Sequence, residues 1–84
     1  RAPAARAADG SFAIIYTRDI RDLTVNIGLL TGSQVRARWY DPTSGSFATA
    51  SGSPFAATGS RIFRPIGNNS RGKPDWVLVL DALP

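Results

Sequence analysis

The sequence contains no cysteine and no histidine, and its six acidic residues are all aspartates. Without cysteine there are no disulfides, no thiolate metal sites and no cysteine nucleophile. Without histidine the chain lacks the commonest zinc ligand and the commonest general base. Calcium accepts oxygen ligands alone, but no loop here is dense in aspartate. We therefore expect no metal and no cofactor.

Long apolar runs are also missing, and none approaches the ~20 residues that a membrane-spanning helix needs. We expect no membrane partner. The N-terminus has no apolar segment typical of a signal peptide, and the chain begins at Arg1 without an initiator methionine. We expect it to be one part of a longer protein, with any signal peptide upstream.

Positive charge is present but dispersed. The formal net charge of +4 comes almost wholly from arginine, because Lys73 is the only lysine. The arginines lie along the whole sequence with aspartates between them, whereas nucleic-acid binding requires clustered cations. Dispersed arginines are typical of a solvated surface, and we expect no nucleic-acid partner.

Short apolar segments bounded by Gly, Pro, Asn, Asp or Ser are typical of antiparallel β-structure, and no stretch has a helical period. The expected strands cover residues 4–8, 12–17, 23–27, 34–40, 61–64 and 76–80, with a further strand after the turn at 41–45. With 84 residues, the chain has room for one core. The sequence predicts a single all-β domain over residues 1–84, a two-sheet antiparallel sandwich of about seven short strands with no helix.

Two of these strands have opposite patterns. The 34–40 segment alternates strictly, which predicts Val35, Ala37 and Trp39 facing the core. The 76–80 segment is apolar at every position and lies between Asp75 and Asp81. That pattern predicts a last strand covered on both faces, by a second sheet or by an adjoining domain. We expect Trp39 and Trp76 to be core aromatics, and Phe55, in the small-residue loop 51–60, to fill the edge of the core.

The outward residues of the 34–40 strand are the candidate binding site. Arg36, Arg38 and Tyr40 recur at every second position, so they share one face. Arginine and tyrosine are enriched where interfaces are energetically dense. Such a stripe suits a polysaccharide, a collagen-like strand or a neighbouring domain, and the alternative is a plain solvated face.

The aspartates do not suggest catalysis. Two carboxyl groups across a cleft could hydrolyse a glycosidic bond. Asp9, Asp19, Asp22 and Asp41 instead fall in predicted turns, where aspartate caps local backbone groups. Asp75 and Asp81 flank the last strand. We expect a non-catalytic domain with no catalytic residues.

Five segments together resemble a known family: residues 9–17, 23–27, 35–45, 61–65 and 75–81. The strongest are the Trp-Tyr-Asp-Pro-x-x-Gly turn and the closing Asp-Trp-Val-Leu-Val-Leu run. The chain resembles the "putative collagen-binding domain of a collagenase". The resemblance implies a β-sandwich that follows a glycoside-hydrolase-like barrel at the C-terminal end of secreted bacterial proteins. The loop 51–60 is longer and richer in small residues than the family pattern leads us to expect.

The resemblance implies an accessory role. The domain would be the C-terminal module of a secreted or extracellular enzyme, its partners being the parent catalytic domain and collagen or polysaccharide. The alternative is a structural domain that packs against the parent barrel and stabilises it.

Overall fold

The computed structural model describes residues 3–84, which form eight strands and one short 3₁₀ turn. In chain order these are β1 (Ala4–Arg6), β2 (Phe12–Thr17), β3 (Leu23–Asn26), η1 (Ile27–Leu29), β4 (Gln34–Tyr40), β5 (Phe47–Thr49), β6 (Phe55–Ala56), β7 (Ser60–Phe63) and β8 (Trp76–Leu83). The all-β prediction is confirmed. The strand beyond the expected seven is β6, which lies inside the segment 51–60.

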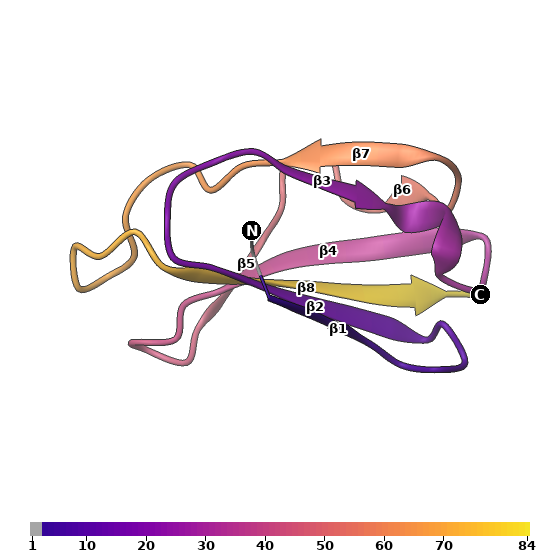
Figure 1. Ribbon diagram of the computed structural model, residues 1–84, viewed down its shortest axis with the longest axis horizontal. Coiled ribbons are helices and arrows are strands. Elements are labelled where there is room, and N and C mark those ends of the chain that lie inside the picture. Colours follow the sequence, from indigo (N-terminus) through magenta and orange to yellow (C-terminus); the bar gives the residue numbers. More distant parts are fainter. Residues whose placement is uncertain (1–2) are drawn as a thin grey trace.

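The strands form two antiparallel sheets that lie as two layers (Figure 1). The larger sheet has the order β1-β2-β8-β4-β5, and β6 also pairs with β4. The smaller sheet consists of β3 and β7. The last strand of the chain therefore lies in the middle of the larger sheet, between β2 and β4. The first strand, β1, lies at one edge of the larger sheet.

The core fills the space between the two layers. Val35 and Ala37 of β4 and Leu78 and Leu80 of β8 have no exposed surface, and Trp39 is 7% exposed. This confirms the inward face predicted for the 34–40 strand. Each fully buried aliphatic side chain of this size contributes about 1.5–3 kcal/mol of transfer free energy. Each short strand contributes only a few side chains to the core. In a chain of this size, each of them is therefore a large part of the total stability.

Two aromatic pairs belong to this core. Phe55 is buried and packs edge-to-face on Phe63 of β7, with ring centroids 5.6 Å apart. Trp39 meets Trp76 edge-on at 6.3 Å. The Trp76 indole nitrogen donates a hydrogen bond to the carbonyl of Gly67 at 2.8 Å. The prediction that both tryptophans and Phe55 serve the core is confirmed.

Asp41 connects the β4–β5 hairpin to the loop that precedes β8. Its buried carboxylate accepts hydrogen bonds from the Thr43 backbone N–H (2.8 Å), the Thr43 hydroxyl (2.6 Å) and the Ser70 N–H (2.9 Å). Burial alone would raise the pKa of Asp41, but these donors outweigh it and hold the pKa well below its usual range. The aspartate of the predicted turn therefore also joins two distant segments.

Four of the expected strand ranges are wrong at their ends. β1 ends at Arg6 rather than at residue 8, and β7 covers Ser60–Phe63 rather than 61–64. Ile27 belongs to η1 rather than to β3, because Asn26 caps the turn by accepting a hydrogen bond from the Gly28 N–H at 3.2 Å. The last strand runs three residues past Leu80, to Leu83, so Asp81 lies inside it. An aspartate is tolerated there because its carboxylate has ion-pair partners on the neighbouring strand.

Within residues 3–84, β8 is covered on one face only, and the predicted cover of its second face by an adjoining domain stays a prediction. Leu78 and Leu80 are fully buried against the smaller sheet, whereas Val77 and Val79 point the other way and are only half-buried. Nothing among residues 3–84 forms a layer over that second face.

Candidate functional site

The uncovered side of the larger sheet is the candidate functional site, and we call it the outer face. It consists of the side chains that alternate with core residues on four strands. They are Phe12, Ile14 and Tyr16 of β2, Arg36, Arg38 and Tyr40 of β4, Phe47 of β5, and Val77, Val79 and Asp81 of β8.

Strand register arranges these side chains in rows, because directly paired residues share a face. The first row is Phe12, Asp81 and Arg36, the second is Ile14, Val79 and Arg38, and the third is Tyr16, Val77, Tyr40 and Phe47. The apolar side chains of β2 therefore lie on one side of β8, and the arginines of β4 lie on its other side. The outer face is amphipathic across its width.

Two arginines share one carboxylate at the centre of this face. Arg36 Nη2 and Arg38 Nη2 each lie 3.1 Å from Asp81 Oδ2. The side chains of Arg38 and Asp81 are 26% and 28% exposed, and that of Arg36 is 46% exposed. One carboxylate facing two guanidinium groups leaves a net positive charge. The cluster can still attract an anion or donate to carbonyl oxygens.

Arg38 is held in place by an aromatic neighbour as well. Its guanidinium carbon lies 4.3 Å from the centroid of the Phe47 ring, within the range of a cation–π interaction. Tyr40 packs on the same Phe47 ring with centroids 5.0 Å apart. The Nε–H of Arg38 is shielded from solvent and finds no acceptor within residues 3–84. These contacts fix the position of Arg38, whereas the tip of Arg36 is freer.

Large apolar groups are exposed around this cluster. Phe12 is 42% exposed, Ile14 39% and Phe47 50%. Contiguous exposed apolar surface rimmed by polar groups is typical of a binding surface. In the described part of the chain, no group of three or more acidic side chains is placed to hold a metal ion. Nor does that part contain a helix long and apolar enough to cross a membrane.

The structure places the three predicted site residues together. Arg36, Arg38 and Tyr40 share one face of β4, as the alternation requires. Sequence reasoning missed Asp81, Val79, Ile14 and Phe12, which the strand register brings to the same face. The predicted hairpin at 41–45 already set Tyr40 near Phe47. No sequence signal placed Asp81 beside two arginines.

Comparison with known proteins gives one family and several similar structures. The family described as "Putative collagen-binding domain of a collagenase" matches residues 1–81. No curated protein matches the chain. Among solved structures, a glycoside hydrolase is similar with a TM-score of 0.80 and 24% identity. A family 5 glycoside hydrolase from Bacteroides vulgatus is similar with a TM-score of 0.81 and 21% identity.

Both similar structures are much longer than this chain. The alignments cover 98% of this chain but 17% of the first structure and 16% of the second. At these identities the likeness concerns the fold.

Proposed function

The chain belongs to the family described as "Putative collagen-binding domain of a collagenase", and on this basis we propose that it is a non-catalytic accessory domain whose outer face binds collagen. The domain is the C-terminal module of a secreted bacterial enzyme with a glycoside-hydrolase-like or collagenase-like catalytic domain. It holds that enzyme against an insoluble matrix.

The composition of the outer face is the observation that carries the proposal. Collagen strands adopt the polyproline II conformation, with solvated backbone carbonyls and exposed proline rings. Aromatic side chains such as Tyr40 and Phe47 pack well on proline rings. Arg36 can donate to strand carbonyls, since Asp81 engages only one of its terminal nitrogens. A sheet face also suits a rod-like ligand better than an enclosed pocket would.

Retention on insoluble fibrillar collagen tests this function. We expect the chain to be retained, and Arg36→Gln together with Tyr40→Ala to reduce retention at least fivefold. Arg64→Gln is the matched control, because it removes the same charge and an exposed ion pair with Asp22, away from the outer face. Circular dichroism establishes that each variant is folded.

The same retention assay on polysaccharides distinguishes a collagen-binding surface from a polysaccharide-binding one. Retention on cellulose, xylan or chitin, without retention on collagen, would assign the outer face to polysaccharide. No retention on any matrix would refute a matrix-binding role.

A second candidate function is packing against the parent catalytic domain, and the exposed apolar row of Ile14 and Val79 favours it. Sheet faces with half-exposed isoleucine and valine are normally covered. The similar glycoside hydrolases contain far more chain than this domain, which would supply the cover.

Ile14→Glu distinguishes the two functions. If the outer face is an interdomain contact, this change lowers the melting temperature of the full-length enzyme by several degrees, yet has little effect on the 84-residue chain alone. An equal effect in both proteins would argue against interdomain packing.

A further inference from the structure

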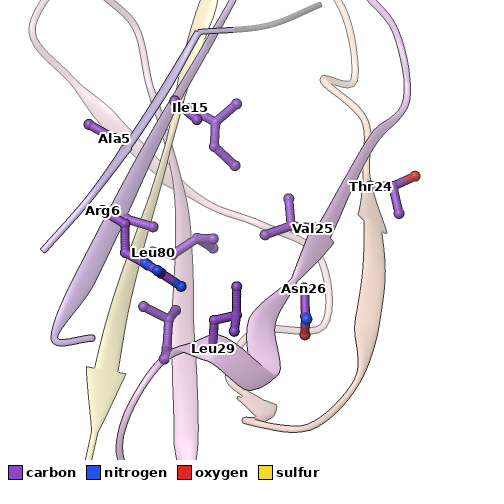
Figure 2. A pocket seen from close by; sticks show the side chains of 11 residues that line it. Ala5, Arg6, Ile15, Thr24, Val25, Asn26, Leu29 and Leu80 are labelled. Atoms are coloured by element: carbon purple, nitrogen blue, oxygen red, sulfur yellow. The ribbon is translucent and has the colours of Figure 1, made fainter. Parts of the chain in front are cut away.

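A groove runs between the free edge of β3 and the β1–β2 side of the larger sheet. A pocket of about 360 Å³ is lined by residues of β1 and β2, by Thr24, Val25 and Asn26 of β3, and by Leu29 of η1 (Figure 2). A second pocket, of about 340 Å³, shares Ala4, Ile15, Thr24 and Val25 with the first and extends to Arg21 and Asp22. The two form one groove along β3, which we call the β3 groove.

The main chain of β3 is available on the groove side. β3 pairs with β7 on one edge, and no other strand among residues 3–84 pairs with it. A strand edge presents unpaired N–H and C=O groups that can accept another extended chain. The smaller sheet has two strands where the larger has five across its width. A third strand beside β3 would extend the layer that is incomplete.

Side chains on the larger sheet leave room for that strand. Ala4 and Arg6 of β1 are paired with Ile15 and Ala13 of β2, so all four face the groove. Ala4 is exposed and Ala13 is half-buried, and both are small. In Figure 2, Ile15 and Val25 point toward one another across the groove and Leu29 points into it, whereas Ala5 points away. Valine-sized side chains at alternate positions of an added strand would fit between them.

The charges of the groove select its occupant. Arg6 lies at the end near Leu29, and Arg21 lies at the opposite end, before β3. Neither arginine forms an ion pair within the described residues. The acidic side chain in the lining, Asp22, is paired with Arg64 at 3.2 Å. An extended chain with a carboxylate toward each end would complement this arrangement.

The geometry points to a strand-addition site, in which the β3 groove binds an extended segment of a partner protein that carries valine-sized residues at alternate positions and a carboxylate toward each end. This site is separate from the proposed collagen-binding surface, because it opens on the core side of the larger sheet. It provides a second attachment point, one that recognises main chain as well as side chains.

A titration with a designed peptide tests the proposal. The probe is the acetylated and amidated heptapeptide Asp-Thr-Val-Thr-Val-Thr-Asp, whose two valines and two aspartates share one face of an extended chain. Its binding is followed by amide NMR of the 84-residue chain. We expect saturable binding with a dissociation constant below about 1 mM, and shifts at the Thr24 and Val25 amides rather than at those of β4. The same peptide with lysine in place of both aspartates should bind at least tenfold more weakly.

Two neighbouring substitutions on β1 form a matched pair. Ala4→Trp fills the groove and should weaken binding of the aspartate peptide at least tenfold. Ala5→Trp places the same side chain on the opposite face and should leave binding unchanged. The comparison of the aspartate and lysine peptides uses the unmodified chain. It therefore tests the charge preference of the groove even if a variant fails to fold.

Four outcomes would overturn the proposal: no saturation, shifts confined to the outer face, equal binding of the two peptides, or equal binding by the two variants. A concentration-dependent dimer whose contacts protect β3 would assign the groove to a second copy of this chain instead. Collagen retention is measured separately, so failure of either site leaves the other testable.

Discussion

Arg38 and Asp81 form an ion pair of 3.1 Å in the middle of the outer face, although 43 positions separate them in the sequence. The pair is diagonal, because Asp81 lies directly opposite Arg36 and Arg38 lies opposite Val79. It joins the two central strands of the larger sheet. It also orients the cation that Phe47 covers, so the same contact supports the fold and shapes the candidate site.

Asp81→Asn should destabilise the chain by about 0.5–1.5 kcal/mol, because two partly exposed ion pairs lose their shared carboxylate. For a domain of this size, about 1 kcal/mol corresponds to roughly 4–8 °C in melting temperature. The loss should shrink in 1 M salt, where charges are screened. Urea denaturation at low and high salt measures both effects.

Asp22→Asn is the control for this prediction. Its ion pair with Arg64 is more exposed, with side chains 61% and 55% accessible, so its removal should cost under about 0.5 kcal/mol. Equal losses for the two variants would mean that the Asp81 cluster has no special stability.

Acid should destabilise the chain through Asp41. The pKa of this carboxyl in the folded chain lies well below its ordinary value of 3.8, so between the two the unfolded chain binds more protons. The stability that the ionised group contributes is therefore present above about pH 4 and is lost as the pH falls further. Urea midpoints measured from pH 7 to pH 2 should fall accordingly.

Two variants isolate the Asp41 contribution. Asp41→Asn should be less stable at pH 7 and should lose less stability between pH 5 and pH 2. Thr43→Val removes the hydroxyl donor at 2.6 Å with little change of shape and should give an intermediate slope. A wild-type slope in Asp41→Asn would mean that other groups cause the acid sensitivity.

Leu80→Ala should destabilise the chain by about 2–5 kcal/mol, because Leu80 is fully buried and the change leaves a cavity. In a domain this small, that loss is a large part of the total stability. Ile66→Ala is the control, since Ile66 is 95% exposed, and it should change stability by less than about 0.5 kcal/mol. Chemical denaturation measures both, and similar losses would contradict the core assignment.

Three glycine-to-alanine changes should separate backbone strain from steric overlap. Gly59 has a φ of +67° with open space around it, so alanine should cost about 1 kcal/mol. Gly32 has a φ of +88°, and a Cβ there would also overlap the Leu83 carbonyl oxygen, so its loss should be clearly larger. Gly67 has neither constraint, and alanine there should be neutral or slightly stabilising. Any other order of melting temperatures would contradict these conformations.

The amino-acid sequence was sufficient for features that depend on neighbouring residues. Strand pleating alternates side chains at a fixed period of two, so the pattern of 34–40 alone assigned Val35 to the core and Arg36 to the outer face. Turn chemistry is equally local, and the Asp-Pro-x-x-Gly segment predicted the hairpin that joins Tyr40 to Phe47. The order of residues along each strand thus determined which side chains share a face.

The tertiary structure alone decided which strands are neighbours. Strand order depends on packing between segments far apart in the chain, and no local pattern encodes that β8 lies between β2 and β4. This order places Asp81 beside two arginines. It therefore explains why an aspartate lies inside β8, a strand that the sequence analysis had predicted to end at Leu80. It also leaves Val79 half-exposed on the outer face, over which residues 3–84 place no second layer. On the other side of the sheet β3 keeps a free edge, because the smaller sheet has only two strands among the described residues.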